Sequence, residues 1–211
     1  MDLTMIVHIA GGAIALIAGL IALCMRKGSN KHKQAGFWFV GAMLVMATTG
    51  GIVAYIIGKP FDTLSSALAI YMVLTGWLTL RQNARHYAWF MFCGGILCIA
   101  GYLAVELYAL QTGHRATDAP IGVGYVFALL LILALVGDIR YMRTGLDRRR
   151  QNRRHLWRLN FGLFMATASF FGARPHLFPE WMSEYGLLLI LSFAPIMAIG
   201  YWRFRLRARA A

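Results

Sequence analysis

The sequence predicts an all-α integral membrane protein, a single domain that spans residues 1–211 and forms a bundle of seven transmembrane helices. Hydrophobic residues make up 59% of the chain and charged residues only 14%. The apolar residues fall in long blocks, and a helix needs about 20 such residues to cross a bilayer. The charged residues gather between these blocks and mostly on one side, as expected for a multi-pass protein.

The apolar blocks place the spans in chain order. They cover residues 3–25, 35–58, 64–80, 87–110, 121–136, 156–173 and 185–201. Between the second and third spans, Pro60 ends one helix and Asp62 suits the N-cap of the next. The fifth span consists almost entirely of Leu, Ala, Val and Ile, so we expect it to face lipid. Pro195 predicts a kink in the last span.

The first span carries one histidine on a face of small residues. This face, at helical spacing, consists of His8, Gly12, Ala15, Gly19 and Ala22. Small residues let two helices approach closely in a membrane, so we expect His8 to point at other helices and not at lipid. His32 and His155 head similar faces on the second and sixth spans.

The positive charges predict the orientation of the chain. Of the 21 Lys and Arg residues, 18 fall on one side of the predicted spans, and eight of these lie in residues 140–158. The positive-inside rule therefore places the N-terminus outside and the C-terminus in the cytoplasm. We expect the basic loops to bind anionic lipids and not nucleic acid, because the arginine-rich segment is confined between two spans.

Three histidines begin spans on the predicted cytoplasmic side: His32, His86 and His155. Two neutral imidazoles from neighbouring helices at one level can ligate a haem iron from both sides. The sequence therefore predicts a b-type haem site in which His32 pairs with His155 or with His86. The alternative is that these histidines bond lipid headgroups or cap helices.

His8 and Glu106 lie at a similar depth near the predicted outer side. Glu106 is the only carboxylate that the predicted spans contain. Since either group alone is costly in hydrocarbon, the two are predicted to form an ion pair or a proton-relay site. The alternative is that Glu106 reaches interfacial water.

Four segments carry a resemblance that covers most of the chain. They are HIAGGAIALIAGLIALCMRKGSNKHKQAG at 8–36, YMVLTGWLTL at 71–80, GDIR at 137–140 and RHLWRLNFGLFMATASFF at 154–171. These segments resemble a family of uncharacterised bacterial predicted membrane proteins that is defined by a domain of unknown function. The resemblance implies a multi-pass protein of the bacterial cytoplasmic (inner) membrane, and no particular activity.

A second likeness concerns the first two spans. His8, Arg26 and His32 follow the order of a helix pair that is similar to that of transmembrane di-haem cytochromes b, which pass electrons from ascorbate. This likeness implies an inner haem with His32 and His86 in the ligand positions. That family also has an outer histidine on the following helix, whereas residues 61–75 contain none.

These patterns leave three functions open. The first is a haem b or quinone-linked redox protein, the second a proton-coupled small-solute transporter that uses His8 and Glu106, and the third a non-catalytic accessory or sensor protein. The sequence has no nucleotide-binding loop, nucleophile elbow or zinc motif, so hydrolysis of a soluble substrate is not expected. It does not decide whether the protein is an enzyme, or whether a second copy or another membrane subunit completes a ligand set.

Overall fold

The computed structural model describes residues 3–81, 85–112, 122–172 and 174–208, with backbone only for residues 85, 86 and 203–208. This described part is almost entirely helical and contains no strand, which confirms the all-α fold class. In chain order the helices are α1 (Leu3–Cys24), α2 (Asn30–Ile56), α3 (Pro60–Leu78), α4 (Arg85–Thr112), α5 (Val123–Thr144), α6 (Arg148–Thr167), η1 (Ala168–Gly172), η2 (Pro175–Leu177), α7 (Glu180–Glu184) and α8 (Leu187–Ala208).

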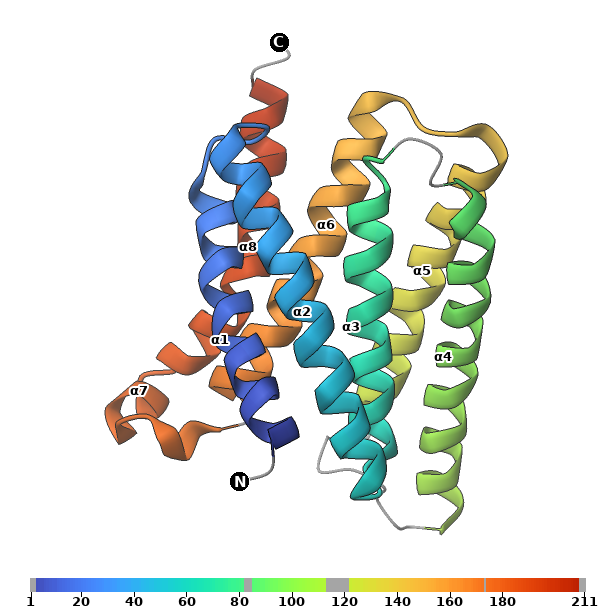
Figure 1. The fold of residues 1–211 in the computed structure, drawn as a ribbon. Coiled ribbons are helices and arrows are strands. Elements are labelled where there is room, and N and C mark those ends of the chain that lie inside the picture. Colours follow the sequence, from blue (N-terminus) through green and yellow to red (C-terminus); the bar gives the residue numbers. More distant parts are fainter. Residues whose placement is uncertain (1–2, 82–84, 113–121, 173, 209–211) are drawn as a thin grey trace.

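The long helices form one bundle in which successive helices run in opposite directions (Figure 1). Helices α1, α2 and α8 lie on one side and α4 and α5 on the other. The central helices α3 and α6 pack against each other. Helix α3 also contacts α2 and α4, and α6 also contacts α1 and α8. The short helices η2 and α7 project from the lower end of the bundle. The N-terminus lies at this end and the C-terminus at the opposite end.

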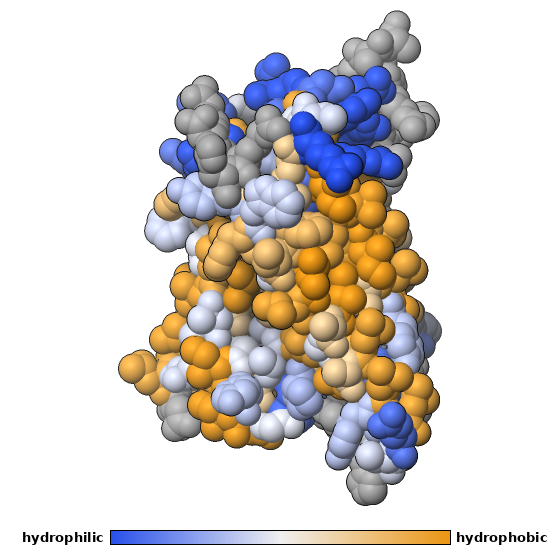
Figure 2. All heavy atoms as spheres, turned by 90° about the vertical axis from the view of Figure 1, so that its right-hand side faces the viewer, coloured by the Kyte–Doolittle hydropathy of each residue, from blue (hydrophilic) through white to orange (hydrophobic). Residues whose placement is uncertain are grey.

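Five helices, α1 to α5, are long and apolar enough to cross a membrane. The apolar part of α8 is shorter, Leu187–Trp202, and α6 begins with a basic turn. Figure 2 shows hydrophobic side chains covering the middle of the visible face, with strongly hydrophilic side chains gathered at the upper end. This distribution agrees with a bundle that meets hydrocarbon at its middle and water at its ends.

Four helices extend well beyond the predicted spans at the basic end. Helix α2 begins at Asn30 instead of Ala35, and α8 continues to Ala208, past the predicted end at Tyr201. Helix α5 continues to Thr144, past the predicted end at Val136, and α6 begins at Arg148 instead of Leu156. Arginine is a good helix former, and Asp147 caps α6 by accepting a hydrogen bond from the backbone N–H of Arg150 at 2.6 Å. The predicted boundaries at residues 121 and 173 lie outside the described residues.

The core consists of two apolar clusters that meet at α3 and α6. One cluster joins α1, α2, α3 and α6, and the other joins α3, α4, α5 and α6. Leu131 and Ala134 of α5 are fully buried in the second cluster. The expectation that the fifth span faces lipid was therefore wrong for this face of α5, because a run of uniformly apolar residues does not distinguish a lipid-facing side from a packed one.

The predicted small-residue face of α1 does pack against other helices. Ala15 and Gly19 are buried, and a Cβ added at Gly19 would lie 2.7 Å from Leu163 Cδ1. Gly12 of this face would place a Cβ 3.3 Å from the sulfur of Met46. Gly11, which was not part of the predicted face, would place one 3.3 Å from the backbone nitrogen of Met46. The absence of side chains at these glycines thus lets α1 approach α2 and α6 closely.

We predict that a large side chain at Gly11 destabilises the bundle. In Gly11→Leu, the leucine must push α1 away from the backbone of α2, and overpacking of this kind typically costs about 1–3 kcal/mol. The thermal unfolding temperature in detergent, followed by tryptophan fluorescence, is expected to fall. Gly41→Leu is the matched control, because a Cβ at this exposed position of α2 meets no atom within 4 Å. Equal unfolding temperatures for the two variants would contradict the close approach of α1 and α2.

Candidate functional site

Helix α6 brings three polar side chains into the interior at the basic end of the bundle: Arg154, His155 and Arg158. Close packing of α6 against α3 makes this arrangement possible. A Cβ added at Gly76 of α3 would lie 2.9 Å from the Cβ of Arg158, so only glycine lets the two backbones approach this closely. The three α6 side chains divide between an acidic partner on α5 and the carbonyls at the end of α3.

The acidic partner is Asp138, which has 1% of its surface exposed. One carboxylate oxygen, Oδ1, accepts hydrogen bonds from Nη2 of Arg154 and, at 2.7 Å, from Nη2 of Arg158. The other, Oδ2, accepts a hydrogen bond from the Tyr71 hydroxyl of α3. Arg158 is fully buried and also donates to the carbonyl of Ala134 at 2.8 Å. One carboxylate thus faces two buried guanidinium groups, which leaves a net positive charge inside the bundle.

This cluster was not predicted from the sequence. Glu106 was expected to be the only carboxylate within a span, and this was wrong, because Asp138 lies within α5, one of the helices that can cross a membrane. Hydropathy ended the fifth span before Asp138, since an isolated carboxylate is costly in hydrocarbon. The available signal was the 154/158 spacing, which puts two arginines on one face of a helix and calls for a buried acid.

Side chains of the same turn of α6 also donate hydrogen bonds to the backbone carbonyls at the end of α3. Nη1 of Arg154 donates to the Thr75 carbonyl at 3.1 Å and to the Thr79 hydroxyl. Nδ1 of His155 lies 3.0 Å from the Gly76 carbonyl oxygen. The last carbonyls of a helix have no partner within it, so side chains must supply one. Because a carbonyl only accepts, Nδ1 of His155 carries the hydrogen, and the neutral ring keeps a lone pair on Nε2.

His32 repeats this arrangement at the end of α1. Its Nδ1 lies 2.9 Å from the Ala22 carbonyl oxygen, and its backbone N–H donates to the Ser29 hydroxyl at 3.2 Å. Nζ of Lys27 donates to the carbonyls of Ala22 and Leu23, both at 2.9 Å. Burial lowers the pKa of Lys27 to about 8. Because the Ala22 carbonyl can only accept, Nδ1 of the neutral His32 ring carries the hydrogen and Nε2 keeps the lone pair.

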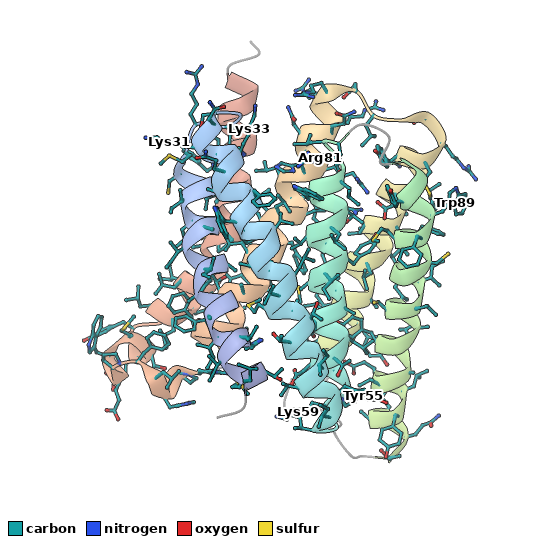
Figure 3. The ribbon with its side chains drawn as sticks, viewed as in Figure 1. Lys31, Lys33, Tyr55, Lys59, Arg81 and Trp89 are labelled. Carbon is teal, nitrogen blue, oxygen red and sulfur yellow. The ribbon has the colours of Figure 1, made fainter. Side chains whose placement is uncertain are left out.

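The structure places His32 in the first turn of α2 and His155 in the N-terminal half of α6, both at the basic end of the bundle. Both rings are half-buried, and the charge of Lys27 acts on both of them. Lys31 and Lys33, which flank His32, lie at the same end as Arg81 in Figure 3. His86 lies in the first turn of α4, but its side chain is outside the described part, so its pairing with His32 stays a prediction.

His8 and Glu106 have separate partners. Nδ1 of His8 lies 2.8 Å from the Met46 carbonyl oxygen of α2. The buried Glu106 carboxylate of α4 accepts hydrogen bonds from the backbone N–H groups of Gly122 at 3.3 Å and Gly124 at 2.7 Å, at the N-terminus of α5. A carboxylate at this position also suits the helix dipole. Helices α2 and α3 lie between α1 and α4 (Figure 1), so the structure does not bring these two side chains together.

Among the described residues, no group of three or more His, Cys, Asp or Glu side chains is arranged to hold a metal ion. Comparisons of the chain with protein-family models, curated proteins and solved structures find no match. The fold alone therefore defines the class of the chain. It is an all-α protein with several helices long and apolar enough to span a membrane.

We predict that Asp138→Asn strongly destabilises the protein. Removing the carboxylate leaves two buried guanidinium groups without a counter-charge, and breaking a buried ion pair on one side costs about 3–5 kcal/mol. The unfolding temperature in detergent is expected to fall sharply.

Asp147→Asn is the matched control for this experiment. It makes the same chemical change at an exposed ion pair with Arg150, where both side chains are about 60% exposed. Asparagine keeps the N-cap of α6, and an exposed pair contributes about 0–1 kcal/mol. If the two variants unfold at the same temperature, the buried cluster is not what holds α5 to α6.

Proposed function

We propose that the chain is a multi-pass protein of the bacterial cytoplasmic membrane, with seven spans, its N-terminus outside and its C-terminus in the cytoplasm. The alternating directions of α1 to α6 and α8 support an odd number of crossings. The distribution of charge supports the orientation, since Lys31, Lys33 and Arg81 lie at one end of the bundle and Lys59 at the other (Figure 3).

Within this membrane protein we propose a redox function in which His32 and His155 are the two ligands of a b-type haem. A single observation carries the proposal. Two imidazoles from different helices lie in one region at the basic end, and each donates its Nδ1–H to a carbonyl at the end of a neighbouring helix. Ligand histidines are usually held in this way, because the Nδ1–H bond fixes the ring and leaves Nε2 free for the iron.

The chemistry of the donor set fits a haem better than a quinone. Two neutral imidazole nitrogens, those of His32 and His155, would hold a haem iron. A quinone carbonyl needs a hydrogen-bond donor, whereas Nε2 of His32 and of His155 are both acceptors in the neutral tautomers that the carbonyl bonds select. The positive charge of Lys27 acts on both rings and suits the carboxylates that a haem carries.

The residues around the two rings keep them neutral and oriented. His155 lies just outside the predicted sixth span. Burial lowers its pKa, the hydrogen bond to the Gly76 carbonyl opposes this by raising it, and the positive charge of Lys27 lowers it further. Its ring is therefore neutral at pH 7, as an iron ligand must be. When bound, the haem would supply one-electron transfer, and the protein would set the ligand identity and the burial that tune its potential.

We predict that the purified protein shows a Soret band, with sharp visible bands after reduction by dithionite. The bands are expected to be lost in His32→Asn and in His155→Asn. Asparagine places an N–H where the ring has Nδ1–H, so the hydrogen bonds to Ala22 and Gly76 are kept while Nε2 is removed. Loss of the spectrum with an unchanged unfolding temperature would then report ligation and not folding.

His176→Asn is the matched control, since this histidine is exposed in η2 at the other end of the bundle. Its spectrum is expected to equal that of the unmodified protein. A colourless protein from haem-replete cells, or an unchanged spectrum in both ligand variants, would reject the haem site and leave the two rings as helix caps.

A further inference from the structure

A cavity of about 620 Å³ lies between α6, α5 and α8. Its polar lining consists of five arginines, namely Arg140, Arg150, Arg153, Arg154 and Arg158. The other lining residues, which include Leu133, Trp157 and Ile199, are uncharged. Among the described residues, therefore, no acidic side chain lines the cavity, although it holds five cationic ones.

Two arginines that line the cavity, Arg154 and Arg158, carry buried N–H donors that the protein does not use. Within the described part of the chain, Nε and Nη1 of Arg158 and Nε of Arg154 have no hydrogen-bond partner. Arg158 is 0% exposed and Arg154 8% exposed. Buried N–H groups of charged side chains are ordinarily bonded, because leaving them unbonded is costly. Aromatic rings also contact both groups, Tyr141 at Arg154 and Tyr71 and Trp157 at Arg158, but they carry no negative charge. The Asp138 carboxylate thus balances only one of the two charges, and the pair of arginines lacks a second anion.

The outer part of the cavity extends this positive character to the surface. Arg140, Arg150 and Arg153 are exposed, and Arg150 forms a weak surface ion pair with Asp147. An anion that enters would thus pass from exposed guanidinium groups to buried ones. Planar guanidinium groups match the geometry of phosphate oxygens and bind them through paired hydrogen bonds.

We propose that this cavity binds an anionic phosphate group, carried either by a lipid headgroup or by free phosphate. Leu133, 58% exposed, belongs to the apolar surface of α5 that adjoins the arginines, which is the arrangement that an acyl chain beside its headgroup requires. Free phosphate would use the arginines alone. Phosphate binding here would use the unused donors of Arg158 and Arg154 and would not require a bound haem.

The test compares ligands on the full-length protein in a neutral detergent. Native mass spectrometry would measure bound phosphatidylglycerol, with phosphatidylcholine as the zwitterionic lipid. Inorganic phosphate would be tested by the shift in unfolding temperature against chloride at equal ionic strength. Arg150→Gln/Arg153→Gln removes two lining charges from α6. Arg148→Gln/Arg149→Gln is the matched control, since it removes two exposed charges from the same turn of α6 that do not line the cavity.

We expect the lining variant to bind the effective ligand about tenfold more weakly than the unmodified protein, and the control variant to bind it equally well. Binding of phosphatidylglycerol with no effect of inorganic phosphate identifies a lipid site, whereas a shift with inorganic phosphate identifies a site for the free anion. Equal weakening in both double variants would overturn the proposal, because it would show attraction to surface charge in general. The absence of binding by every probe would overturn it as well.

Arg158→Lys tests the buried end separately. Lysine keeps a positive charge opposite Asp138, so the fold is expected to persist, but it lacks the Nε and Nη1 donors of arginine. The variant is expected to bind the ligand at least as weakly as the lining variant. Unchanged binding in a folded Arg158→Lys protein would show that the unused donors do not contact the ligand.

Discussion

The buried carboxylate of Asp138 joins the three helices on which the rest of the bundle packs. It belongs to α5, it accepts hydrogen bonds from two arginines of α6, and it accepts a third from Tyr71 of α3. Apolar packing alone allows α5 to slide or rotate against α6, because Leu, Ala and Val offer many similar contacts. A charged group with directed partners allows one register only. The position of α6 between the two apolar clusters is therefore fixed by charge as much as by packing.

A second constraint is that the backbone groups at helix ends inside the bundle need hydrogen-bond partners. The carbonyls that end α1 accept from Lys27 and His32, those that end α3 accept from Arg154 and His155, and the N–H groups that begin α5 donate to Glu106. In a low-dielectric environment each unpaired backbone group costs several kcal/mol, so a side chain from the next helix supplies the missing partner. The histidines at the starts of α2 and α6 thus contribute to the fold whether or not they also ligate iron.

Periodicity and charge predicted much of the fold, but not the pairing of buried polar groups. The small-residue face of α1 was visible because a helix repeats it every three or four residues, and Ala15 and Gly19 are indeed buried. Asp138 was missed because hydropathy assigns each residue a transfer free energy from its type alone. It does not include the hydrogen bond from Tyr71, which lies 67 residues away in the chain. The partners of Glu106 are backbone N–H groups at Gly122 and Gly124, and no residue type signals them.

The two proposed sites both use residues of α6 and place different demands on the same positive charge. A phosphate needs guanidinium groups that remain charged, and arginine keeps its proton even when buried. An iron ligand needs imidazoles that remain neutral, and nearby cations oppose their protonation. The excess of Lys and Arg at this end of the bundle serves both demands at once. A bound phosphate would reduce the net positive charge beside His155, because Arg154, which lines the cavity, precedes it in α6.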